Sequence, residues 1–209
     1  MIQILKYGEV PAEEVFARAE PKVDVSAVVA DILENVRTRK DTAVLEYTEK
    51  FDGVRPEPLR VGAEEMQEAL SLVEPEFLRV LSRAAANIRA FHSRQVRNSF
   101  IINDMPGIVM GQKVIPVDRA GLYVPGGTAA YPSTVLMDAI PAKIAGVQEL
   151  VIVTPPGPDG KVNPYVLAAA KVAGVDRIFK VGCIFRQPVK RCIRDRFICF
   201  RYEQGNVRQ

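Results

Sequence analysis

The feature that most constrains the fold is an ordered strand, glycine turn and helix around Gly121-Leu-Tyr-Val-Pro-Gly-Gly-Thr128. A run of β-type residues at 114–124 ends in Pro-Gly-Gly, and Ser133 downstream is a suitable helix cap. The apolar positions of the expected helix are Val135, Leu136, Ala139 and Ile140. Backbone N–H groups at such a turn and helix start can face an anion. The segment therefore predicts a mount for a phosphate-bearing ligand.

The same alternation continues along the chain. Residues 149–154 form a short apolar run typical of a parallel strand, residues 163–173 an Ala-rich helix closed by Gly174, and residues 177–181 a further strand. Strand, helix, strand, helix and strand over residues 117–181 predict a doubly wound α/β unit with right-handed crossovers. Pro141 inside the first helix predicts a kink or a restart there.

The first hundred residues have helical periodicity. Helices are expected at about 25–36, at 41–53 with Asp41 as cap, at 63–73, and from Glu74 onward. The expected inward seam of the last helix comprises Phe77, Leu81, Ala84, Ile88 and Phe91. Short strands are expected at 100–102, 108–110 and 112–117.

The expected fold class is therefore α/β, with a helical N-terminal region packed on an incomplete doubly wound, Rossmann-like parallel sheet. The expected divisions are a helical region at 1–98, an α/β domain of NAD-binding type at 99–182, and an aberrant tail at 183–209.

Composition narrows the class of protein. The chain has 209 residues, 48% of them hydrophobic, which is enough for a substantial core. Its net charge of +3 is too small to indicate nucleic-acid binding. No stretch approaches the roughly 20 apolar residues of a membrane helix, and the N-terminus lacks the order of a signal peptide. We therefore expect a cytoplasmic protein that binds neither membrane nor nucleic acid.

The tail differs from the rest of the chain. Residues 183–209 hold seven basic and two acidic residues and all three cysteines, Cys183, Cys192 and Cys199, but no Ala, Leu, Ser or Thr. The cysteine spacing matches no common zinc pattern. A segment foreign to the fold is the favoured interpretation, and a tail that binds nucleic acid remains an alternative.

Two loops follow the carboxyl ends of the expected parallel strands, at 123–132 and 154–159, where ligands bind in such sheets. Tyr123 is placed to stack on a planar base, and Pro125-Gly126-Gly127 lets the backbone approach a ligand. The alternative is a tight connection in which Tyr123 only packs. His92, the single histidine, is expected at a helix end rather than as a base.

The sequence shows no set of residues arranged for catalysis. Ser133 and Thr134 have no histidine partner, and neither Asp118 nor Asp138 has a second carboxylate that the sequence places beside it.

The segment Arg119-Ala-Gly-Leu-Tyr-Val-Pro-Gly-Gly-Thr-Ala-Ala-Tyr-Pro-Ser-Thr-Val-Leu-Met137, with residues 140–146 and 151–156, resembles histidinol dehydrogenases. Residues 41–53 and 87–92 resemble the N-terminal region of that family. The resemblance implies NAD-dependent oxidation of L-histidinol to L-histidine through the aldehyde, with bound zinc, in a cytoplasmic homodimer whose two chains complete each site. It implies incomplete Rossmann-like domains, similar to those of aldehyde dehydrogenases, and makes Tyr123 an NAD contact.

The resemblance ends at about Gly182. The family continues with glycine and Ala-Gln-Ala, whose glutamine contacts NAD, whereas Phe185 stands at that place here and cannot replace an amide. The family's zinc ligands, its Glu-His proton pair and its histidinol-binding groups find no match in this sequence. We therefore expect no catalytic or metal-binding residue in this chain and no activity from it alone.

A shifted reading frame is our hypothesis for the tail, and the nucleotide sequence beyond codon 182 tests it, since another frame should encode Ala-Gln-Ala. For the function of the chain, two alternatives to an inactive, truncated member of the family remain open. They are a non-catalytic nucleotide-binding or assembly module and a misfolded remnant.

Overall fold

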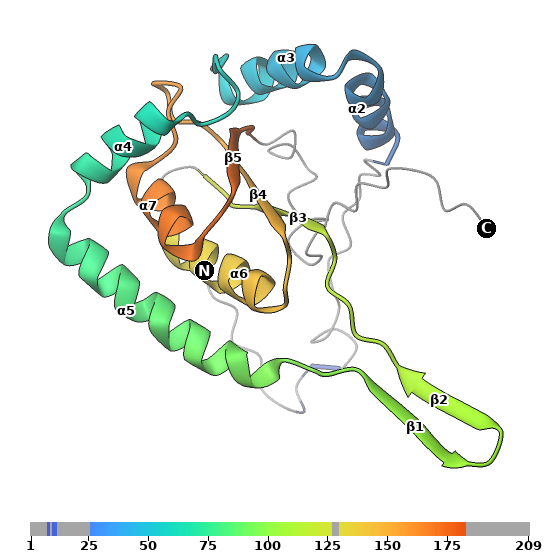
Figure 1. Ribbon diagram of the computed structural model, residues 1–209. Coiled ribbons are helices and arrows are strands. Elements are labelled where there is room, and N and C mark those ends of the chain that lie inside the picture. Colours follow the sequence, from blue (N-terminus) through green and yellow to red (C-terminus); the bar gives the residue numbers. More distant parts are fainter. Residues whose placement is uncertain (1–7, 9, 12–25, 127–129, 183–209) are drawn as a thin grey trace.

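A computed structural model describes residues 8, 10–11, 26–126 and 130–182. A small sheet, two layers of helices and a projecting two-stranded arm make up this part (Figure 1). The N-terminal half contains α2 Ser26–Arg39, α3 Asp41–Asp52, α4 Ala63–Leu72, α5 Pro75–His92 and η1 Ser93–Gln95. The arm consists of β1 Phe100–Met105 and β2 Ile108–Gln112. The remaining elements are β3 Arg119–Tyr123, α6 Pro132–Ile144, β4 Glu149–Thr154, α7 Pro164–Ala173 and β5 Arg177–Lys180.

The three-stranded sheet is parallel throughout, in the order β3-β4-β5. The crossover helices α6 and α7 pack against each other on one face of it, as right-handed connections between neighbouring strands require (Figure 1). The predicted α/β alternation is thus confirmed. The order reversal of a doubly wound sheet does not occur among the described strands.

Burial alternates along the strands and shows which face the helices cover. Leu150, Ile152 and Thr154 of β4 are buried beneath α6 and α7, while Val151 and Val153 point to the other face and are half-buried. Helices α4 and α5 pack on α7 and α6, so these two helices form an outer layer over the crossover helices, whereas α2 and α3 pack mainly on each other. One hydrophobic core therefore joins α4 and α5 to the crossover helices and the sheet.

The β5 edge of the sheet is covered by the connection between α3 and α4. Arg60 forms an antiparallel bridge with Phe179, Val61 N donates to Ile178 O at 3.0 Å, and Lys180 N donates to Leu59 O at 2.8 Å. A single extended stretch thus satisfies edge groups of β5 that would otherwise be open to another strand.

Two predicted helix caps are wrong by one or two residues. Helix α6 begins at Pro132 with Tyr131 at the N-cap, so Ser133 lies inside the first turn. Proline favours the first helical position because its missing N–H has no helical acceptor there, and it moves the start forward. Asp41 is the first residue of α3 rather than its cap, which is Lys40 at φ 50°. Its carboxylate still favours that helix end through the dipole.

Helix α6 runs through Pro141 without the restart that the sequence suggested. Ala139 and Ile140 are fully buried just before the proline, and Ala145 N donates to Pro141 O at 2.8 Å just after it. Packing on one side and the closing hydrogen bond on the other hold both halves in one helix. These contacts within α6 compensate for the helical hydrogen bond that Pro141 cannot donate, because proline has no N–H.

The predicted inward seam of α5 is correct in its centre and wrong at its end. Leu81 is buried at 5%, whereas Phe91 is 63% exposed. The last turn of α5 extends beyond the helices that it packs on, so the periodic pattern continues past the core. The expected strand at 112–117 is also absent, since residues 113–118 lie between β2 and β3 without regular pairing.

Glycines end two helices as expected. Gly53 after α3 and Gly174 after α7 both adopt the left-handed conformation, at φ 74° and 78°. Gly182 has a different role, because a Cβ there would lie 1.4 Å from Asp52 Oδ2. The end of α3 therefore packs directly against the backbone that leaves β5.

Candidate functional site

The carboxyl ends of the three parallel strands lie side by side at one edge of the sheet. Tyr123 ends β3 opposite Val153, and Thr154 ends β4 opposite Lys180, the last residue of β5. Tyr123 is half-buried, and Thr154 and Lys180 are buried. The ladder continues one residue further, since Val124 N donates to Val153 O at 2.9 Å. This is the edge where ligands bind in open parallel sheets.

The loops after β3 and β4 touch each other at Gly126. A Cβ on Gly126 would lie 2.5 Å from Pro155 Cγ, closer than real side chains come. Glycine is needed here because the two loops approach so closely, and not because of a left-handed backbone, since Gly126 does not have a positive φ. The structure thus brings together the two loops that the sequence selected separately. Gly127, the second glycine of the turn, lies outside the described residues.

The start of α6 adjoins this pair of loops. No side chain caps it: at the N-cap, Tyr131 accepts from Val135 N through its backbone carbonyl, at 3.4 Å, and not through its side chain. Pro132 has no N–H, so the first-turn donors belong to Ser133 and Thr134. The helix start that the predicted anion site requires is present, but Ser133 has a backbone N–H there and does not cap the helix with its hydroxyl group.

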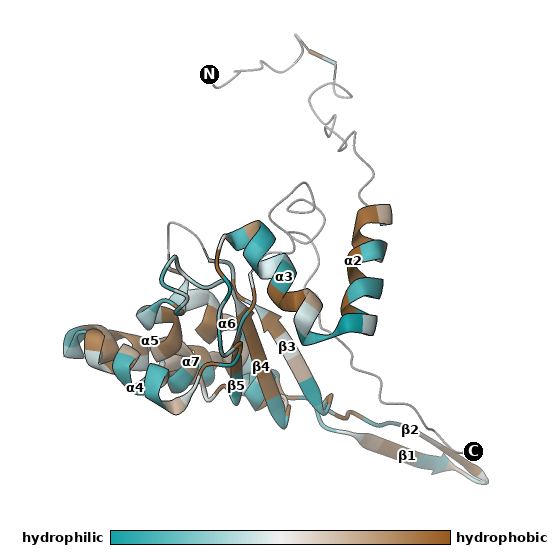
Figure 2. Cartoon of the chain, turned by 90° about the horizontal axis from the view of Figure 1, so that it is seen from above, coloured by the Kyte–Doolittle hydropathy of each residue, from teal (hydrophilic) through white to brown (hydrophobic). Residues whose placement is uncertain are grey.

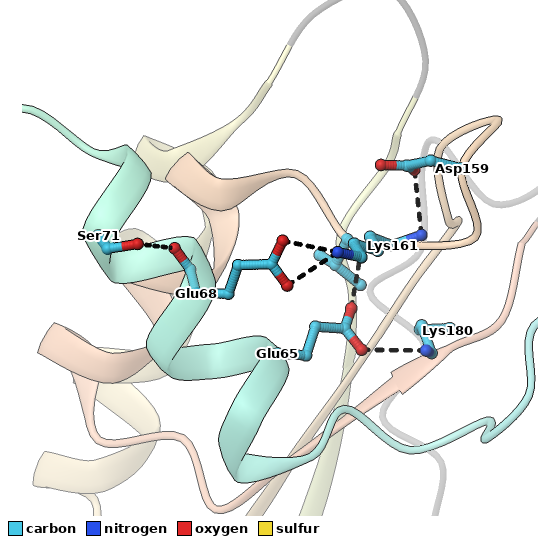
Figure 3. A network of polar contacts seen from close by, with 7 residues as sticks. Glu65, Glu68, Ser71, Asp159, Lys161 and Lys180 are labelled. Atoms are coloured by element: carbon cyan, nitrogen blue, oxygen red, sulfur yellow. Dashed lines mark hydrogen bonds and ion pairs between the residues drawn. The ribbon is translucent and has the colours of Figure 1, made fainter.

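A buried ion pair holds the end of β5, and sequence reasoning missed it. Lys180 Nζ lies 3.0 Å from Glu65 Oε2, with the side chains only 5% and 15% exposed (Figure 3). The other oxygen, Glu65 Oε1, accepts a hydrogen bond from Val162 N at 3.1 Å. The lysine charge is therefore directed to α4 and is not offered to a ligand at the strand ends. The available signal was a lysine on the same strand face as buried Ile178.

A second, exposed pair extends this network. Lys161 Nζ lies 2.6 Å and 2.8 Å from the two carboxylate oxygens of Glu68, and Asp159 Oδ1 accepts from Lys161 N at 3.1 Å (Figure 3). The hydrogen bond from Lys161 to Glu68 raises the pKa of that lysine. These contacts fix the loop that follows β4 to the outer face of α4.

The remaining candidate side chains lie away from the strand ends or have other partners. His92 is at the end of α5, where its Nδ1 lies 2.6 Å from Gln95 Oε1 and its ring meets Phe91 edge-on. The predicted helix-terminal position of this histidine is correct. Asp138 is half-buried on α6, and burial raises the pKa of its carboxyl group.

In the part of the chain that the structure describes, no three His, Cys, Asp or Glu side chains gather closely enough to hold a metal ion. None of its helices is both long and apolar enough to cross a bilayer. The tail at 183–209, with its three cysteines, lies outside the described residues.

The sequence profile of histidinol dehydrogenases matches residues 17–185, most of the chain. The chain belongs to the histidinol dehydrogenase family. The matched region spans the described helices α2–α5, the arm and the complete β3–β5 sheet, and it ends three residues beyond Gly182, where the resemblance was expected to stop.

Individual relatives agree with this assignment. A histidinol dehydrogenase of Methanosarcina barkeri is 49% identical over 176 residues, covering 84% of this chain and 41% of the relative. One from Geobacillus kaustophilus is 53% identical over 154 residues, which is 74% of this chain and 36% of the relative.

A solved structure confirms the fold class. The crystal structure of histidinol dehydrogenase from Elizabethkingia anophelis superposes with a TM-score of 0.75 at 35% identity, covering 79% of this chain and 38% of that one. The chain thus spans well under half the length of these members of the histidinol dehydrogenase family, and it corresponds to their N-terminal part.

Proposed function

We propose that this chain supplies the NAD-facing part of a histidinol dehydrogenase and that Tyr123 contacts the dinucleotide. The single observation that carries the proposal is the position of Tyr123 at the carboxyl end of β3, beside the Gly126–Pro155 contact and the start of α6. A half-buried ring at a strand end offers a face for a planar base, and the neighbouring helix start offers backbone donors to a phosphate.

The proposed reaction is the family's oxidation of L-histidinol to L-histidine, in which NAD accepts hydride and zinc orients the substrate. Within this chain, the described residues contribute binding and positioning. The loops after β3 and β4 form the ligand-facing edge, and the Lys180–Glu65 pair holds the end of β5 in place. No residue of the 209 matches the family's zinc ligands or proton-transfer pair, so we expect these residues alone to produce no NADH from histidinol.

Binding of NAD tests the proposal directly. We expect NAD to bind the wild-type chain and the Tyr123→Ala variant to bind roughly tenfold more weakly, because aromatic stacking contributes about 1–1.5 kcal/mol. Tyr165→Phe is the control, since the Tyr165 hydroxyl is bonded to Glu74 on the outer helical layer. Equal NAD binding by wild type and Tyr123→Ala would contradict the assignment of Tyr123.

A second candidate function is assembly. The β1–β2 arm and the α2–α3 pair project from the body with exposed apolar side chains, which favours contact with another polypeptide chain (Figure 2). We propose that, as in the family, that other chain is a second copy in a homodimer.

A further inference from the structure

The loop at 155–161 continues the chain beyond the carboxyl end of β4 and closes on itself. Gly157 N donates to Lys161 O at 2.8 Å, and Gly160 N donates to Gly157 O at 2.9 Å. The Asp159 carboxylate lies inside this turn, since its Oδ1 accepts from Lys161 N at 3.1 Å. A Cβ on Gly157 would lie 2.9 Å from the same oxygen. The Asp159 carboxylate is therefore held against the backbone of the turn.

This loop adjoins the edge where we propose that the dinucleotide binds. Its first residue, Pro155, meets Gly126 in the loop after β3, and β3 and β4 are the first two strands of the parallel sheet. In sheets of this kind the pyrophosphate lies at the turn after the first strand, and an acidic side chain beyond the second strand accepts from the ribose 2′-hydroxyl. Asp159 is the single acidic residue of the loop at 155–161. It is therefore the candidate acceptor for the ribose.

Two lysines lie near this edge, and carboxylates of α4 engage both of them. Lys161 Nζ lies 2.6 Å and 2.8 Å from the two carboxylate oxygens of Glu68, and Lys180 Nζ forms the buried pair with Glu65 (Figure 3). A lysine ammonium group near the ribose would attract a phosphate there, because it is a compact positive charge. In this chain both ammonium groups are directed to α4 instead.

The carboxylate of Asp159 is not neutralised in the same way. Asp159 is exposed, and it forms no ion pair with another residue that the structure describes. Arg60 lies beside β5 but on its other face, because it is directly opposite Phe179, and Phe179 and Lys180 point to opposite faces of the sheet. The loop after β4 therefore presents a negative charge, while the positive charge of its own lysine is balanced by Glu68.

We propose that the loop after β4, together with Glu68, makes the dinucleotide site selective for NAD over NADP. The two molecules differ by one phosphate, which NADP carries on the 2′-oxygen of the adenosine ribose. Asp159 accepts a hydrogen bond from the free 2′-hydroxyl of NAD and repels the phosphate of NADP. Glu68 holds the ammonium group of Lys161, which would otherwise attract that phosphate. This inference rests on the proposed NAD contact of Tyr123 and names the residues that select the cofactor.

Calorimetric titration of the full chain with NAD and with NADP tests the proposal. Wild type should bind NADP about tenfold more weakly than NAD, because of the repulsion between Asp159 and the phosphate. Glu68→Gln should narrow this ratio about fivefold, the most that releasing an exposed ion pair is expected to give, and leave NAD binding unchanged. Glu64→Gln is the matched control, because Glu64 is exposed on the same helix and carries the same charge but is not bonded to Lys161. It should keep the wild-type ratio.

Two further variants separate the effect of charge from that of a loosened loop. Lys161→Met added to Glu68→Gln should restore the wild-type ratio, because the released ammonium group is gone, whereas a loosened loop would stay loosened. Asp159→Asn should also narrow the ratio, since the amide removes the negative charge but its oxygen can still accept from Lys161 N.

Equal binding of NAD and NADP by wild type, or a ratio that Glu68→Gln leaves unchanged, would overturn the inference. If Tyr123→Ala weakens NAD binding while Glu68→Gln leaves the ratio unchanged, the proposed function stands and only the assignment of the selecting residues fails. If wild type binds neither dinucleotide, both fail.

Discussion

Lys180 Nζ and Glu65 Oε2 lie 3.0 Å apart, joining the last residue of β5 to the first turn of α4. The same carboxylate accepts from Val162 N, so one side chain fixes a strand end, a helix start and the loop before α7. Both ionic groups are largely removed from water, and each satisfies the other. The Lys180–Glu65 ion pair therefore fixes the edge of the sheet where a ligand is proposed to bind.

Removal of one partner of this pair should destabilise the fold strongly. We expect Glu65→Ala to lower the free energy of unfolding by about 3 kcal/mol, because it leaves the Lys180 ammonium buried without its counter-charge. Glu64→Ala, at the exposed neighbouring position, should change it by less than about 0.5 kcal/mol. Urea denaturation compares the two variants, and similar losses in both would contradict the role of the pair.

The double variant Glu65→Ala with Lys180→Met separates lost attraction from an orphaned charge. It should recover part of the stability lost by Glu65→Ala, since the buried cation is removed as well. No recovery would indicate that the Val162 hydrogen bond, rather than the ion pair, accounts for the effect of Glu65.

The contact between the loops after β3 and β4 predicts that Gly126 tolerates no side chain. Gly126→Ala puts a methyl group 2.5 Å from Pro155 Cγ, so one loop must move, at a cost of about 1–3 kcal/mol. Gly62→Ala is the comparison, because a Cβ there meets nothing within 4 Å, and its only expected cost is that of alanine at the N-cap of α4, below about 1 kcal/mol. Thermal unfolding should show the larger loss for Gly126→Ala, and NAD titration should show a loss for Gly126→Ala alone.

Replacement of Asp138 should stabilise the folded chain in a pH-dependent way. Burial raises the pKa of this carboxyl group in the folded chain above its unfolded value, so the ionised form is disfavoured by folding. The stability contribution of Asp138 is thus full below about pH 4 and is lost as the pH rises through the folded pKa. Asp138→Asn should raise the melting temperature at pH 7 and give no advantage at pH 3.

Asp176 provides the opposite case for the same measurement. Burial acts to raise its pKa, but hydrogen bonds from Lys143 and Leu150 N outweigh burial and lower it. Asp176→Asn should therefore lower the melting temperature at pH 7, with the difference shrinking as the pH falls through the folded pKa of Asp176. Equal shifts of the same sign for both variants would contradict the two assignments.

Local signals in the sequence were sufficient for much of the fold. The predicted strand at 149–154 and the predicted helix closed by Gly174 are confirmed. Both predictions rest on signals within a few residues, an apolar run for the strand and a glycine that adopts the left-handed conformation for the helix end. Ser133 was assigned as a cap because serine favours that position, and the neighbouring Pro132 decided the start instead.

Contacts between residues far apart in the sequence could not be predicted from such local signals. Glu65 and Lys180 are 115 residues apart, and their pairing depends on α4 crossing the end of β5. The exposure of Phe91 depends on where the body ends rather than on the helical period. The meeting of Gly126 with Pro155 follows only once β3 and β4 are known to be neighbours. The divisions at residues 98 and 182 remain predictions.

The most direct test of the proposed function is to identify which tyrosine responds to NAD. In NMR spectra of the chain with ¹³C-labelled tyrosine rings, addition of NAD should shift the ring resonances of Tyr123, assigned by their absence in Tyr123→Phe. The resonances of Tyr47, which stacks near Phe51, and of Tyr165, which meets Phe77 edge-on, should stay in place. Unchanged Tyr123 resonances at saturating NAD would contradict the account.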